Sequence, residues 1–125
     1  KLLYLCKKNK IKIIATVPLA SGFLAKKNLY LKFNKNDMRN KLDTEFISWV
    51  KSMHKKMNFL EDENNNLISK SLRYVLSNED ISVVVPGMRN ARQVNFNYNA
   101  FMKGPLAKTD INKIRKLPKF YPGWK

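Results

Sequence analysis

The chain has 125 residues, of which 44% are hydrophobic and 11% aromatic, which is enough for one modest core and outside the range of disordered sequences. It contains no run of about 18 apolar residues, the minimum for a membrane-spanning helix. The formal net charge is +16, but lysines are spread along the chain singly or in pairs. This distribution argues against a nucleic-acid binder and favours attraction to anions in general.

Cys6 is the only cysteine, so the chain can form no internal disulfide, and the reducing cytoplasm is the expected location. The opening KLLYLCKKNK lacks an initiator Met and a small-residue cleavage site. It therefore predicts the end of a helix that begins upstream, and not a signal peptide.

The first predicted strand is IKIIATV, residues 11–17, a β-branched run that Pro18 ends. Residues 18–42 show no sustained periodicity and predict a long loop. A loop of this length is uncommon in a compact domain and is usually functional.

Two helices are predicted after this loop. The first begins at Asp43 or Thr44, either of which can cap it, and a polar break at residues 61–66 precedes the second. Their apolar faces at helical spacing consist of Phe46, Ile47, Val50, Met53 and Met57 in the first helix and Leu67, Ile68, Leu72, Val75 and Leu76 in the second.

The second predicted strand is ISVVV, residues 81–85, whose unbroken apolar run is typical of a parallel strand covered on both faces. A helix over residues 90–101 follows the break at Pro86-Gly87, and a short helix runs through Leu117. The residues of the 90–101 helix that we expect to face inward are Ala91, Val94, Tyr98 and Phe101.

Strands separated by helices predict parallel neighbours in an α/β sheet. Two strands alone would leave edges and faces uncovered, so we expect the chain to be part of a larger fold. Ligands of parallel sheets bind at the carboxyl ends of the strands, which directs attention to the two segments that follow the strands.

Both of these segments carry a glycine motif, PLASG at residues 18–22 and PGMR at residues 86–89. Gly87 allows a ligand to approach the backbone closely, and the following helix presents N–H groups at the positive end of its dipole. Arg89 and Arg92 add charge in a geometry suited to phosphate. The pattern predicts a phosphate site. The alternative is that both arginines are solvated side chains on a surface helix.

Other kinds of site chemistry find no support in the sequence. His54 is the only histidine and lies within a predicted helix, so no metal site is predicted. Cys6 predicts a buried or incidental thiol, and residues 61–63 predict a solvated acidic turn. No serine lies in a G-x-S-x-G element.

The segment IKIIATVPLASGFLAKK, followed about sixty residues later by LRYVLSNEDISVVVPGMRNARQVNFNYNA, resembles the carboxyl-terminal part of the aldo/keto reductases. The resemblance continues through GPLAKTDINKIRKL and so covers nearly the whole chain. These enzymes are TIM (β/α)8 barrels that use NADP(H). The resemblance implies that residues 1–125 are the C-terminal portion of one such α/β domain, with two parallel strands, the seventh and eighth, and several helices.

On the diphosphate side of the cofactor, the resemblance implies that the backbone of Leu19, Ser21 and Gly22 runs beside the diphosphate. Lys27 and Arg39 match a lysine and an arginine that fold over the cofactor in long-loop members. The resemblance also implies that Thr16 lies beside the cofactor, at the position where many members place an aromatic residue that stacks on the nicotinamide.

On the adenine side, the resemblance implies that Gly87 approaches the ribose phosphate, with Arg89, Arg92 and Gln93 around it, and that Asn97 faces the adenine. Some members have a lysine for this phosphate at the position of Pro86. Here the charge would have to come from an arginine.

The family's catalytic Asp, Tyr, Lys and His belong to earlier strands, and none of them is present. The resemblance thus implies a C-terminal fragment, inactive alone, of an NADP(H)-dependent aldo/keto reductase that reduces aldehydes or ketones to alcohols by hydride transfer. Its partners would be a small-molecule carbonyl substrate and the missing N-terminal half of the barrel. The alternatives are a non-catalytic, cofactor-sensing barrel subunit and a basic nucleic-acid-binding module.

Overall fold

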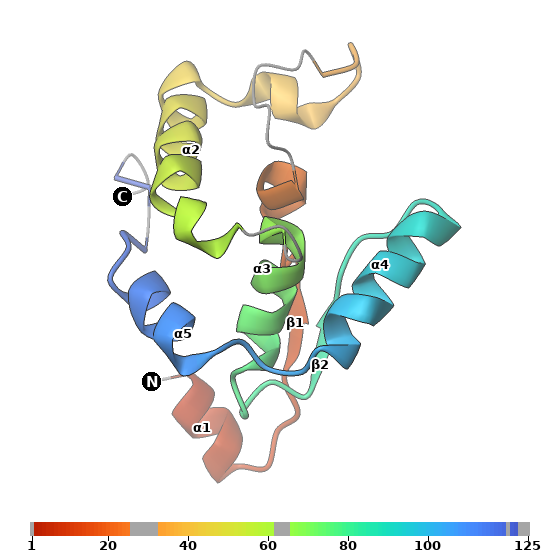
Figure 1. The fold of residues 1–125 in the computed structure, drawn as a ribbon, viewed down its shortest axis with the longest axis vertical. Helices are drawn as coiled ribbons and strands as arrows, with labels where there is room; N and C mark the ends of the chain where they lie inside the picture. Colours follow the sequence, from red (N-terminus) through yellow and green to blue (C-terminus); the bar gives the residue numbers. More distant parts are fainter. Residues whose placement is uncertain (1, 26–32, 62–65, 120, 123–125) are drawn as a thin grey trace.

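The computed structural model describes residues 2–25, 33–61, 66–119 and 121–122. Every predicted helix and strand is present, and the described parts of the predicted loop, residues 18–25 and 33–42, contain two 3-10 helices (Figure 1). In chain order the elements, with η for 3-10 helices, are α1 (Leu2–Lys8), β1 (Ile14–Thr16), η1 (Ala20–Ala25), η2 (Met38–Lys41), α2 (Thr44–Lys56), η3 (Asn58–Leu60), α3 (Leu67–Leu76), β2 (Val83–Val85), α4 (Ala91–Met102) and α5 (Lys108–Arg115).

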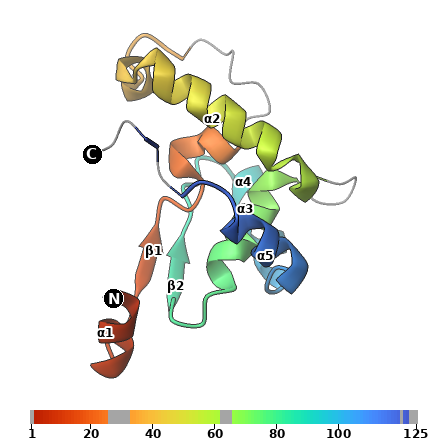
Figure 2. The same ribbon diagram turned by 90° about the vertical axis from the view of Figure 1, so that its left-hand side faces the viewer.

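The strands β1 and β2 pair in parallel, with Ile14 opposite Val83, which confirms the predicted parallel arrangement. Figure 2 shows both arrows pointing the same way, so that the two carboxyl ends lie at one edge. The paired segments are shorter than the predicted strands 11–17 and 81–85. Among the described residues each strand has a single neighbour, which limits the hydrogen-bonded ladder.

The prediction that β2 is covered on both faces is wrong for the described residues. The helix α3 contacts β2 on one face. The side chains of the other face are open to solvent: Ile14 is 62% exposed, Val83 48% and Val85 49%. An exposed row of β-branched side chains in a parallel pair indicates a face that is built to be covered.

The face of α4 that was predicted to point inward is also exposed, so this prediction is wrong as well. The buried residue of α4 is Ala100. The residues predicted to face inward, Ala91, Val94, Tyr98 and Phe101, are exposed. Of these, Val94, Tyr98 and Phe101 line an apolar groove between α3, β2 and α4.

The core lies between α2, η3, α3 and the turn η1. Val50 and Met53 of α2 and Leu67 and Leu72 of α3 are buried, which confirms the predicted apolar faces of these helices. The turn η1 joins this core through Phe23, whose ring packs edge-on against Phe46 of α2.

Three of the described α-helices begin with a side-chain cap. Asp43, Asn66 and Asn90 precede α2, α3 and α4, and each side chain accepts a hydrogen bond from the backbone N–H three residues later. A cap of this kind contributes about 1 kcal/mol to helix stability. The predicted cap at Asp43 is therefore confirmed.

The open sheet face generates a prediction for the chain of residues 1–125 expressed alone. Val83→Thr together with Val85→Thr should lower binding of a hydrophobic dye, because threonine replaces exposed methyl groups without removing buried contacts. Val84→Thr on the opposite, half-buried face is the matched control and should instead lower the melting temperature. Equal dye binding by the wild type and the double variant would contradict the assignment of the faces.

Candidate functional site

The chain leaves β1 through a tight turn with an unusual backbone. Val17, Ala20 and Ser21 have φ angles of 54°, 48° and 54°. Residues other than glycine rarely adopt this left-handed region, which costs roughly 1–2 kcal/mol per residue. Conformations of this kind persist only where the surroundings fix them, and they cluster at functional sites. The turn after β1 is therefore the first candidate element of a site.

Gly22 is the residue of this turn at which glycine is most favoured. Its φ is +86°, and an added Cβ would lie 3.2 Å from Nη1 of Arg39. A side chain here would adopt a strained backbone conformation and would make a tight contact with Arg39 from η2.

Arg39 packs against this turn and is itself held by Asp37. Nε and Nη2 of Arg39 donate to the two carboxylate oxygens of Asp37 at 2.9 and 2.7 Å, and Nη1 donates to the carbonyl oxygen of Ser21 at 3.1 Å. The guanidinium also lies over the ring of Phe33, 4.2 Å from its centroid. Arg39 therefore joins η2 to the backbone of η1.

The charge of Asp37 connects this cluster with the second strand end. The hydrogen bond from the Arg39 side chain holds the pKa of the Asp37 carboxyl far below its usual range, and the Arg39 backbone N–H adds to this effect. The positive charge of Arg89 lowers the same pKa further, as a smaller contribution. Arg89 follows β2, and the parallel pairing places the ends of β1 and β2 at the same edge, the upper one in Figure 1.

The turn after β2 leaves open space at its glycine. A Cβ added to Gly87 would meet no atom within 4 Å, and the φ of Gly87 is not in the left-handed region. Neither packing nor strain within the described residues therefore requires glycine here. Arg89 and Arg92 are exposed beside this space, and neither forms an ion pair with a described residue. The turn can accept an anion from outside.

Gln93 acts at the start of α4. Its Oε1 accepts a hydrogen bond from the backbone N–H of Arg89 at 2.7 Å, while its own N–H donates to the side chain of Asn90 at 3.0 Å. This reciprocal arrangement is a variant of the capping box, and it fixes the direction in which the turn enters the helix.

Asn97 lies on the groove side of α4. Its side chain is among those that line the apolar groove, and its Nδ2 is buried without a hydrogen-bond partner among the described residues. A buried donor without a partner costs about 1–3 kcal/mol. Asn97 therefore offers an unused donor in an apolar setting.

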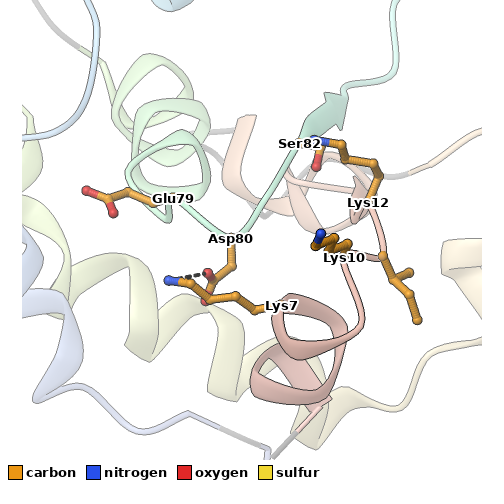
Figure 3. A pocket seen from close by; sticks show the side chains of 7 residues that line it. Lys7, Lys10, Lys12, Glu79, Asp80 and Ser82 are labelled. Carbon is orange, nitrogen blue, oxygen red and sulfur yellow. Dashed lines mark ion pairs between the residues drawn. The ribbon is translucent and has the colours of Figure 1, made fainter.

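A separate hollow of about 570 Å³ lies at the amino-terminal ends of the strands (Figure 3). Lys7 pairs with Asp80 across it at 3.4 Å, and the side chains of Lys10 and Lys12 stand nearby. In parallel α/β folds this end carries stability, whereas sites lie at the carboxyl ends. We therefore assign the functional site to the opposite end.

The structure places the described site residues in two groups, one after each strand. Thr16, Leu19, Ser21, Gly22 and Arg39 lie at the end of β1, whereas Gly87, Arg89, Arg92, Gln93 and Asn97 follow β2. Lys27 lies outside the described residues.

Sequence reasoning missed three residues that shape these groups: Asp37, Phe33 and Asn90. The spacing Asn90-x-x-Gln93 is a capping signal that could have been found from the sequence. Asp37 stands two residues before Arg39, but its pairing depends on the 3-10 turn and left no comparable signal.

Two kinds of feature are absent from the described segments. No three His, Cys, Asp or Glu side chains are placed to share a metal ion within these segments. No helix of the described segments is both long and apolar enough to cross a membrane.

Comparison with known proteins identifies the family. The family model described as "Aldo/keto reductase family" matches residues 1–119. No curated protein and no solved structure matches the chain. The family consists of oxidoreductases that generally use nicotinamide cofactors, and a pair of parallel strands with several helices agrees with part of its α/β barrel. The chain belongs to the aldo/keto reductase family.

Proposed function

We propose that residues 1–125 form the carboxyl-terminal portion of an NADP(H)-dependent aldo/keto reductase domain and bind the adenine and phosphate side of the cofactor. The observation that carries this proposal is the parallel pairing of β1 with β2, which brings the turns after both strands to one edge of the sheet. Arg39 links Asp37 to Ser21. One dinucleotide could contact both turns at once.

The chemistry of the second turn fits a phosphate monoester. Open space beside Gly87 admits a phosphate to the backbone, and the start of α4 supplies a positive dipole end. Arg89 and Arg92 would add charge-assisted hydrogen bonds, each contributing roughly 1.5–3 kcal/mol before solvent screening. This supports NADP(H) over NAD(H), since the 2′-phosphate is the group that distinguishes them.

The unused donor of Asn97 fits an adenine ring. Adenine presents ring nitrogens that accept hydrogen bonds and a flat apolar surface. The groove beside Asn97 is apolar and includes Val94 and Met88. A bound adenine would satisfy the buried Nδ2 and cover part of this exposed apolar surface.

When bound, NADP(H) would supply the hydride for reduction of an aldehyde or ketone to an alcohol. The residues of this chain would bind and orient the cofactor and hold water away from its phosphates. The acid and base of the reaction, and most contacts to the carbonyl substrate, would come from the N-terminal half of the barrel. We place the intact enzyme in the cytoplasm.

The exposed sheet face supports the proposal that this chain binds the cofactor while the N-terminal half supplies the acid and base. A TIM barrel needs about 250 residues, so 125 residues supply roughly half of one. Further barrel strands would cover the exposed side chains of Ile14, Val83 and Val85. The same strands would carry the groups that do the chemistry.

Replacing both Arg89 and Arg92 by alanine in the full-length protein should raise the Kd of NADPH about 10–100-fold and change that of NADH far less. The reason is that only NADPH carries the 2′-phosphate. Titration of each cofactor by calorimetry measures both constants. The control is Arg115→Ala with Lys116→Ala, which removes the same charge from the end of α5. Equal losses for NADPH and NADH would contradict the assigned role of the two arginines.

Asn97→Leu should weaken NADPH about tenfold, because the leucine cannot donate to the adenine. The same variant should keep or raise the melting temperature of the cofactor-free protein, since it removes an unsatisfied buried donor. Asn95→Leu, on an exposed face of the same helix, is the matched control. If both variants bind NADPH with equal affinity, Asn97 does not face the adenine.

A further inference from the structure

The strained turn η1 is held at two of its carbonyl groups by side chains from different elements. Nη1 of Arg39, from η2, donates to the carbonyl oxygen of Ser21 at 3.1 Å. Nε2 of His54, from α2, hydrogen-bonds to the carbonyl oxygen of Phe23 at 2.7 Å. Phe23 itself is buried. The segment between these two attachments carries the left-handed residues Ser21 and Gly22.

Most of the Arg39 guanidinium is engaged in contacts with other groups of the protein. Three of its N–H groups are used by Asp37 and Ser21, one face lies over Phe33, and the side chain is only 16% exposed. Asp37, at 21%, is similarly shielded. Two parallel hydrogen bonds to a carboxylate fix the orientation of a guanidinium more firmly than a single contact does.

This commitment differs from the role that the resemblance implies for Arg39, which is to fold over the cofactor. An arginine that serves mainly to neutralise phosphate is exposed and unpaired, as Arg89 and Arg92 are. The charge of Arg39 is instead balanced by Asp37, and its Nη1 donates a hydrogen bond to the backbone carbonyl of Ser21.

We propose that Arg39 is a positioning residue: oriented by Asp37, it holds the Ser21 carbonyl and so keeps η1 in the shape that receives the cofactor diphosphate. Arg39 thus acts through the backbone of η1 and not by binding phosphate. Asp37 is ionised in the neutral range, as an ordinary aspartate is, and the hydrogen bond from Arg39 lowers the pKa of its carboxyl further, so that the pair also persists in mild acid. The inference rests on the proposed function only for the identity of the cofactor. The hydrogen bond from Arg39 to the Ser21 carbonyl is present whatever ligand the turn receives.

The variant Asp37→Asn distinguishes this role from direct phosphate binding, because the two roles predict opposite changes in NADPH affinity. If Arg39 bound phosphate, removal of the nearby negative charge would free Arg39 and tighten NADPH binding. If Arg39 positions η1, the same change loosens the turn and should weaken NADPH binding about threefold to tenfold. Arg39→Lys should weaken binding at least as much, since a lysine keeps the charge but cannot reach both Asp37 and Ser21.

The experiment measures NADPH affinity and amide hydrogen exchange in the full-length protein. In the cofactor-free protein, both variants should speed exchange at residues 20–25 at least tenfold, with the melting temperature unchanged within a few degrees. The control is Lys41→Ala, which removes an exposed charge from the same 3-10 helix and should alter neither measurement. Unchanged exchange in both variants, or tighter NADPH binding by Asp37→Asn, would overturn the proposal. Failure of the wild type to bind NADPH would refute the proposed function, and the exchange data would still decide whether Arg39 holds the turn.

Discussion

Parallel pairing of β1 with β2 is the constraint on which the candidate site depends. Ile14 and Val83 are far apart in the sequence, yet their pairing brings the turns after both strands to one edge of the sheet. At this edge the first turn is joined to the Asp37–Arg39 pair through the Ser21 carbonyl, and the second turn carries the exposed side chain of Arg89. Without the parallel register these residues would form two isolated surface loops with no common ligand.

Backbone strain and side-chain contacts complement each other at this edge. The first turn is strained and is held by Arg39 and His54, whereas the second is open at Gly87 and carries exposed arginines. A rigid turn is suited to presenting backbone groups to a ligand, and an exposed guanidinium is suited to capturing charge. We infer that orientation resides mainly in the first turn and affinity for the phosphate mainly in the second.

Local sequence patterns predicted the helices and strands well, but they predicted poorly which faces of these elements are buried. The spacing of Val50, Met53, Leu67 and Leu72 placed two buried helix faces, because helical periodicity depends only on the chain itself. Burial of Val83 was predicted from its apolar run, but Val83 is 48% exposed among the described residues, because burial depends on which elements pack against a strand and not on the strand alone. The contacts of Asp37 and Arg39 could not be predicted either, since they depend on a 3-10 turn for which the sequence shows no periodic pattern.

The central claim is that both strand-end turns bind one nucleotide. Its most direct test is amide NMR of the full-length protein titrated with 2′,5′-ADP, which carries the adenine and two of the relevant phosphates. The account predicts saturable shifts of the amide signals of Gly87 and Arg89 together with those of Ser21 and Gly22, with a single dissociation constant. Shifts confined to one turn, or separate constants for the two turns, would contradict it.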